Sequence, residues 1–293
     1  MSRWRALIYA TVLEILGEPF VLLVTLAALV LAVLAPTFHY HQFGEPSRMA
    51  RDAGLSALIL GGAALAIFAP IKTYRREIET GTILTALALP VSRTTFFLAK
   101  FIGLTLAYCV FILTILCTSL TIVNGAEIGG AFAAVRADIA RLWGPSLSFA
   151  LAVLILPIFI AAILNRFARF RFTLSANLIA FILSFVGTFY RFDFSLARRF
   201  LPVALLATIP AFILLAAAST FAIRMRSNAA TSATALVALA LIPALGNYCL
   251  SDALTDGGAI SFSYFLCALA AALPILAALL LLGITFLKGR DLT

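Results

Sequence analysis

Residues 72–100 read KTYRREIETGTILTALALPVSRTTFFLAK, the longest stretch of this chain that a lipid bilayer would not accept. Its charged residues are Lys72, Arg75, Arg76, Glu77, Glu79, Arg93 and Lys100. Apolar runs long enough to cross a bilayer flank the stretch on both sides. It therefore predicts a polar, structured segment that leaves the membrane between two spanning helices.

The composition around this stretch is that of an integral membrane protein. The 293 residues are 63% hydrophobic and only 11% charged, and the mean hydropathy is +1.12. A soluble domain has about a quarter of its residues charged. We therefore expect an all-α, polytopic membrane protein that forms a single transmembrane domain over residues 1–293, with about six to eight transmembrane helices.

Apolar segments of about 17 to 25 residues locate these helices. We place eight spans at about 20–36, 54–71, 97–123, 146–164, 172–190, 201–223, 232–250 and 264–287. The fifth is short and lies between Arg171 and Arg191. It could instead form a re-entrant pair with part of the sixth, which would leave six full spans and the same orientation downstream.

The first residues predict a helix of a different kind. Residues 3–18 carry apolar side chains at helical spacing, including Trp4 and Leu7, and Glu18-Pro19 then interrupts the pattern. This favours a helix lying in the membrane interface. A signal peptide is the competing interpretation, but its apolar core would start too far from the first arginines.

The distribution of charge sets the orientation. With the N-terminus on the cytoplasmic side, Lys and Arg are concentrated in the inner segments, whereas the acidic residues are divided more evenly. The net charge of +9 then lies on the inner face, as the positive-inside rule requires. We expect both termini and residues 72–95 in the cytoplasm, and no role in nucleic acid binding.

Two further patterns concern the membrane domain itself. Residues 124–144 place apolar side chains at spacings of three and four, which predicts an amphipathic helix on the outer face. Gly61 and Gly62, with Ala57 and Ala66, are small residues that allow two helices to approach closely.

The sequence lacks residues that ATP binding, metal binding or ion-coupled transport would need. None of the three lysines follows a glycine, so the sequence contains no P-loop, and we expect no ATPase activity, cofactor or metal in this chain. His39 and His41 are the only histidines, and the four cysteines form no CxxC pair. The predicted spans hold Asn177, Ser184 and Thr208 but no acid at mid-depth, which disfavours an ion-coupled carrier.

The pattern of apolar and charged side chains over residues 72–89 favours a helix along the cytoplasmic face. Pro90 would end it, and Ser92 is placed to cap the next helix. A soluble partner pushing on such a helix would move the second and third spans together. An ordinary cytoplasmic loop is the alternative.

The same stretch resembles the signature of permeases of type 2 ATP-binding cassette (ABC) exporters. The matching residues are Glu77, Glu79, Gly81-Thr82, Pro90, Ser92-Arg93 and Lys100, together with Glu14 and Gly17-Glu18-Pro19 in the first helix. The resemblance covers about the first 125 residues. The chain departs from it at Leu84 and Thr85, where the family often has a second Glu, and in its eight spans, because the family more often has six.

The resemblance implies a permease that dimerises with a second copy or a paralogue and binds two copies of a separate ATPase, which holds ATP and Mg. It implies a bacterial inner-membrane exporter in which residues 72–95 dock into the ATPase as a coupling helix. By resemblance the coupling residues are Arg75, Glu77, Glu79, Gly81, Thr82, Pro90, Ser92 and Arg93. Arg93 and Lys100 would also anchor the next helix at anionic lipid headgroups.

Two other functions stay open on the sequence alone. A secondary, ion-coupled transporter would need an ionisable group facing a central cavity. A membrane-embedded enzyme would need His39, His41 and acidic residues gathered around one point.

Overall fold

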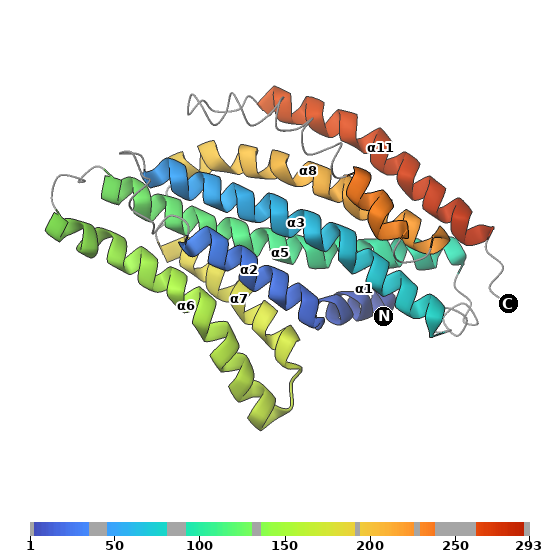
Figure 1. Cartoon of the computed structure of the whole chain (residues 1–293), viewed down its shortest axis with the longest axis horizontal. Coiled ribbons are helices and arrows are strands. Elements are labelled where there is room, and N and C mark those ends of the chain that lie inside the picture. The colour runs from blue at the N-terminus through green and yellow to red at the C-terminus, as the bar shows by residue number, and fades with distance from the viewer. Residues whose placement is uncertain are drawn as a thin grey trace. The chain divides into compact units, whose positions relative to one another are not determined.

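The computed structural model describes residues 3–34, 46–80, 92–130, 136–190, 194–225, 229–237 and 262–289. These residues form α-helices and no strands, as the composition predicts. The helices are α1 (Arg3–Leu16), α2 (Pro19–Leu34), α3 (Pro46–Glu79), α5 (Arg93–Gly130), α6 (Arg136–Ala168), α7 (Phe172–Tyr190), α8 (Phe194–Arg224) and α11 (Phe262–Lys288) (Figure 1). Residues 229–237 are helical as well.

Six helices of the described chain are long and apolar enough to cross a membrane. Their candidate spans are Ala50–Glu79, Arg93–Val123, Leu151–Ala168, Phe172–Phe189, Phe200–Arg224 and Leu266–Lys288. The pair α1 and α2, separated by a two-residue break, provides a seventh if it is counted as one span. The polytopic helical fold is therefore confirmed. Most of the predicted span at 232–250 lies outside the described residues.

The polar stretch differs from the prediction in where its helix begins. Residues 72–79 do not start a new helix, because they continue α3 without interruption as far as Glu79. No helix-breaking residue stands between the apolar part of α3 and Thr80. Residues 81–91 lie outside the described residues, so the rest of the expected helix is not described. The predicted cap is confirmed, since the backbone N–H of Thr95 donates to Ser92 Oγ at 3.1 Å.

The predicted outer segment at 124–144 also belongs to longer helices. α5 continues to Gly130 and α6 begins at Arg136, so the described parts of this segment extend two predicted spans. The alanines of the segment favour helix, which allows each helix to continue past the apolar region. Residues 131–135 lie outside the described residues.

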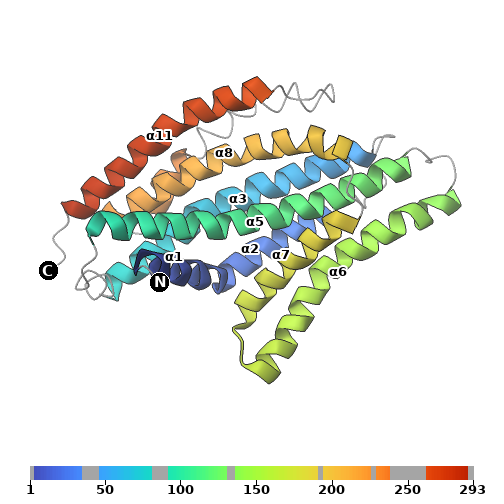
Figure 2. The ribbon, with the colours of Figure 1, turned by 180° about the vertical axis from the view of Figure 1, so that it is seen from behind.

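The chain divides into two compact units, which are described separately. Unit 2 comprises Leu16–Gly62 and Cys109–Leu205. Within it, α6 and α7 form an antiparallel hairpin, and α2 packs against both (Figure 2). Leu22 of α2, Ala161 of α6 and Ala176 of α7 form a small buried cluster there. Short side chains at the centre of this cluster allow the three helices to lie close together.

Polar side chains of α7 bind the backbone at the break before α2. Pro19 has no N–H to donate. α2 begins at Pro19, and the carbonyl of Glu18, just before it, accepts from Val21 N–H at 3.1 Å. The carbonyls just before it are bound from α7: Asn177 Nδ2 donates to Leu16 O at 2.8 Å, and Thr173 Oγ1 donates to Gly17 O at 2.5 Å. Asn177, one of the polar residues of the predicted spans, therefore forms a hydrogen bond between two helices.

Close approach of α3 and α5 in unit 2 depends on the small residues noted in the sequence. A Cβ atom added to Gly61 would lie 2.7 Å from Cζ of Phe111, closer than real Cβ contacts allow. Farther along, Thr118 Oγ1 of α5 donates to Ser184 Oγ of α7 at 2.9 Å. Small residues and hydroxyl groups thus bring these helices together, as is usual in membranes.

Unit 1 comprises Met1–Ile15, Ala63–Tyr108 and Leu206–Thr293. It contains most of α1, the C-terminal part of α3, the N-terminal part of α5 and all of α11. Gly103 of α5 lies directly against α1, because an added Cβ would be 2.7 Å from Cβ of Thr11. The two helices therefore touch almost backbone to backbone.

Replacing Gly103 with leucine should push α1 away from α5. We expect the free energy of unfolding to fall by about 1–3 kcal/mol, the usual cost of forcing a larger side chain into a packed site. Thermal unfolding of the detergent-solubilised protein measures this loss. Ile102→Leu is the control, since Ile102 neighbours Gly103 but is 41% exposed. Equal stability of G103L and I102L would contradict the close contact.

Candidate functional site

A buried ammonium group lies at the centre of unit 1. Lys100, in the second turn of α5, is only 3% exposed. An unpaired charge in such a place costs several kcal/mol of desolvation, so a buried lysine needs anionic partners. The carboxylates that surround Lys100 come from two other helices.

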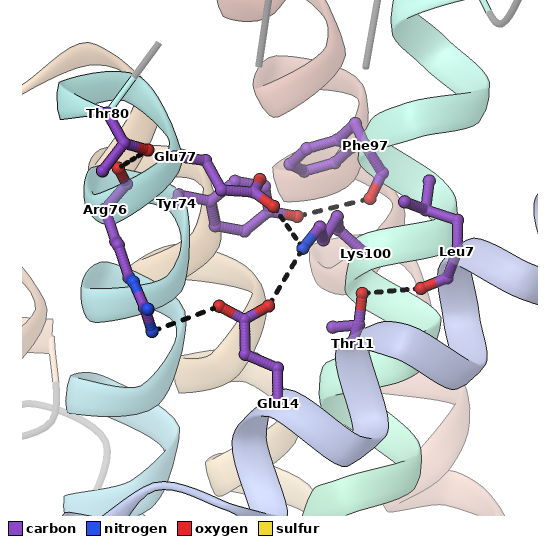
Figure 3. A network of polar contacts seen from close by, with 9 residues as sticks. All are labelled: Leu7, Thr11, Glu14, Tyr74, Arg76, Glu77, Thr80, Phe97 and Lys100. Atoms are coloured by element: carbon purple, nitrogen blue, oxygen red, sulfur yellow. Dashed lines mark hydrogen bonds and ion pairs between the residues drawn. The ribbon is translucent and has the colours of Figure 1, made fainter. Parts of the chain in front are cut away.

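Glu77 of α3 and Glu14 of α1 supply these carboxylates. Lys100 Nζ lies 2.5 Å from Glu77 Oε1 and 3.5 Å from Glu14 Oε2, and Arg76 Nη1 of α3 lies 3.6 Å from Glu14 Oε1 (Figure 3). Two cations and two anions therefore form one network with no formal net charge. The network joins α1, α3 and α5 at one point.

The apolar surroundings of this network strengthen it. The Tyr74 ring of α3 is 1% exposed and stacks on Phe97 of α5, with 5.8 Å between ring centroids. Its hydroxyl group donates to the Phe97 carbonyl at 3.3 Å. These rings lie beside the Lys100–Glu77 pair (Figure 3), and an ion pair is stronger where apolar groups surround it.

A second ion pair on α3 has the opposite character. Arg75 Nη2 lies 2.7 Å from Glu79 Oε1, and the Glu79 side chain is 61% exposed. An exposed pair four residues apart contributes only about 0.3–0.5 kcal/mol. Arg76 and Glu77, near the end of α3, therefore belong to the buried network, whereas Glu79 carries an accessible charge.

Arg93 binds the end of the last described helix. Its Nη1 donates to the carbonyls of Leu287 and Lys288 in α11, at 3.3 and 3.2 Å. The last carbonyls of a helix have no partner within that helix, so a cation there satisfies them and the helix dipole. The expectation that Lys100 contacts lipid headgroups was wrong, because its ammonium group is buried among carboxylates.

The structure thus separates the residues predicted for the coupling site. Glu77 joins the buried network, Arg75 pairs with Glu79 on the exposed face, Ser92 caps α5 and Arg93 binds α11. Gly81, Thr82 and Pro90 lie outside the described residues.

Three members of the network, Glu14, Arg76 and Lys100, were not assigned to the coupling site from sequence. The available signal was a lysine that begins an apolar span, since a charge in that position requires a partner. The sequence does not indicate which of several acids would be that partner.

Metal binding has no support in the described part of the chain. No group of three or more His, Cys, Asp or Glu side chains comes close enough there to hold an ion. His39 and His41 lie outside the described residues.

Comparison with known families gives this arrangement a context. A family model described as "ABC-2 family transporter protein" matches residues 17–187, which is more than half of the chain. The chain belongs to the ABC-2 transporter permease family. No curated protein and no solved structure matches it. Permeases of this family are the membrane components of ABC transporters, and the ATPase is a separate partner.

The matched region of this ABC-2 permease covers the helices that build most of the network. It includes α2, α3, α5, α6 and most of α7, and therefore Glu77 and Lys100. Glu14 lies just before it. The chain is a multi-pass membrane permease whose polar contacts gather where α3 ends and α5 begins.

Replacing Lys100 with methionine should destabilise the permease strongly. Two carboxylates would lose their main cation, and breaking a buried ion pair costs about 3–5 kcal/mol. Lys100→Met combined with Glu77→Gln should lose less than the sum of the single losses, because each change removes part of the same interaction. Thermal unfolding of the four proteins measures this coupling.

Glu79→Gln is the matched control on the same helix. It removes an exposed charge and should cost less than about 1 kcal/mol. Additive losses for Lys100 and Glu77 would show that the two side chains do not interact.

Proposed function

We propose that this chain is the permease subunit of an ATP-driven exporter that moves a small or amphipathic substrate across the membrane. Membership of the ABC-2 family supports transport by a permease subunit. The sequence contains no P-loop, so a partner subunit would bind ATP and Mg and supply the energy. The direction of transport is part of the proposal.

The polar groups inside the membrane domain support an amphipathic substrate. Thr118 Oγ1 of α5 donates to Ser184 Oγ of α7, and Thr188 Oγ1 of α7 lies 3.1 Å from Cys117 O of α5. Hydroxyl groups engaged in this way hold helices together. They leave a largely apolar interior, which suits lipid-like molecules better than ions.

The working assembly we propose contains two permease copies, identical or paralogous, and two ATPase subunits. Residues 81–91, which connect α3 to α5, would dock into the ATPase, with Arg75 and Glu79 beside them. The observation that carries this assignment is the Lys100 network. It ties the helix before this segment to the helix after it, and both to α1.

Movement of the docking segment would therefore reach three helices at once. Glu77 transmits it from α3 to Lys100 of α5, and Glu14 transmits it to α1. Arg93 extends the same path to α11, because it is the first residue of α5 and binds the carbonyls at the end of α11. We propose that this rigid group of helices converts closure of the ATPase into movement of the permease.

The location we propose is the inner membrane of a bacterium, with both termini in the cytoplasm. The excess of Lys and Arg on one side of the predicted topology supports this orientation. Residues 72–95 would then lie on the side where ATP is available.

Glu79→Arg should uncouple the ATPase from transport. The change reverses an accessible charge next to the docking segment but leaves the buried network intact, so the protein should insert and fold normally. Gly81→Pro, within the segment itself, should have the same effect. We expect the purified complex to hydrolyse ATP while substrate transport into vesicles falls at least tenfold.

Ala229→Arg serves as the control, because it adds a cation at another exposed position that lies before the predicted span at 232–250. It should keep coupled transport. Unchanged coupling in both E79R and G81P would contradict the docking role. A permease that transports actively when purified without an ATPase would contradict the proposed function as a whole.

The topology can be tested with a single cysteine at position 85. In a chain whose four native cysteines are replaced by alanine, Thr85→Cys should react with a membrane-impermeant maleimide only after the membrane is opened. Labelling of intact cells would place residues 81–91 outside and overturn the orientation.

A further inference from the structure

The turn of the α6–α7 hairpin combines positive charge with exposed aromatic rings. Its sequence, NRFARFR, covers residues 165–171, and every one of these residues is exposed. Phe167 is 83% exposed and Phe170 is 58% exposed. Only residues 169–171 are non-helical, and Arg169 adopts a positive φ of 56° to reverse the chain. Residues 165–171 are called the hairpin tip.

The charge of the hairpin tip is not neutralised within the described protein. The tip contains three arginines and no acidic residue. In the part of the chain that the structure describes, Arg166, Arg169 and Arg171 form no ion pair. This differs from unit 1, where Lys100 and Arg76 are paired with carboxylates.

The lengths of the two candidate spans predict that the tip lies at a membrane surface. The candidate span of α6 ends at Ala168 and that of α7 begins at Phe172, and each contains 18 residues. At about 1.5 Å per residue, such a span is about 27 Å long, close to the hydrocarbon thickness of a bilayer. A three-residue turn adds little height, so we expect the arginines to lie near the depth of the phosphate groups.

The sides of the hairpin are open to lipid as well. Only 17% of the α6 span and 33% of the α7 span is buried within the protein. The exposed side chains are large and apolar, among them Ile155, Phe159, Val186 and Phe189. Phospholipids can therefore approach the tip from the membrane without displacing any described part of the chain.

We propose that the hairpin tip is a binding site for anionic phospholipids. Guanidinium groups bind phosphate oxygens with paired, charge-assisted hydrogen bonds. The Phe167 and Phe170 rings would insert between the lipid chains below the headgroups, where aromatic side chains are enriched. The site goes beyond the proposed transport function and does not depend on an ATPase.

The position of the tip favours lipid over a soluble protein as the occupant. A docking element must reach beyond the headgroups to meet a partner in the cytoplasm, and this turn has no helical extension past the two spans. Two exposed phenylalanines would be costly in water but stable at the lipid boundary.

Titration of the purified permease with phosphatidylglycerol, followed by native mass spectrometry, tests the proposal. The wild-type protein should bind this lipid more tightly than phosphatidylcholine, whereas R166Q/R169Q/R171Q should lose the preference. Each arginine near an anionic surface contributes about a fivefold gain in affinity, so we expect a loss on the order of 100-fold. R166K/R169K/R171K keeps the charge and should keep most of the preference.

The matched control is R5Q/R224Q/K288Q, which removes three exposed cations elsewhere. It should lose clearly less of the preference for phosphatidylglycerol than the tip variant does, and an equal loss would show a general effect of net charge and overturn the proposal. Unchanged lipid preference in the tip variant overturns it as well. So does a tip variant that keeps its lipids but no longer retains an ATPase, since the tip would then bind protein. Inorganic phosphate should not compete with the lipid, and full competition would point to a soluble anion instead.

Discussion

The most demanding interaction in this permease is the pairing of a buried ammonium group. Lys100 has lost nearly all contact with water, and its charge can be kept only if carboxylates come within hydrogen-bonding distance. They come from α1 and α3, so the arrangement of three helices depends on one cation. Moving any of these helices away would expose or isolate a charge. These ion pairs therefore oppose separation of the three helices, as the proposed coupling role would require.

The same rule governs the uncharged polar groups of unit 2. Backbone carbonyls that lose their helical partners cannot turn to water inside a bilayer, so side chains must supply donors. Asn177 and Thr173 do so for the carbonyls of Leu16 and Gly17 at the break before α2. The backbone at the break before Pro19 is thus bound to α7 by two hydrogen bonds. In both units, polar groups that a membrane would penalise determine which helices meet.

The fold class and most of the spans could be predicted, because length and hydropathy are local properties of the sequence. The contact at Gly61 was predicted for the same reason. The continuation of α3 through residues 72–79 was not predicted. The charges of these residues indicated that the chain leaves the membrane there, but helix propensity and the Arg75–Glu79 pair prolong α3. The partners of Lys100 were also missed. Pairing across distant helices depends on their packing, and no local pattern distinguishes Glu14 from the other acids.

The contact between Arg93 and α11 has a consequence for biosynthesis. Its acceptors, the carbonyls of Leu287 and Lys288, lie 194 and 195 residues farther along the chain. The ribosome adds them only after all the residues between α5 and the end of α11. Unit 1 therefore cannot be completed before α11 has been made, because Arg93 of α5 lacks these acceptors until then. A chain cut before Leu287 would carry the described helices α1 to α8 and still lack the two carbonyl groups that Arg93 binds.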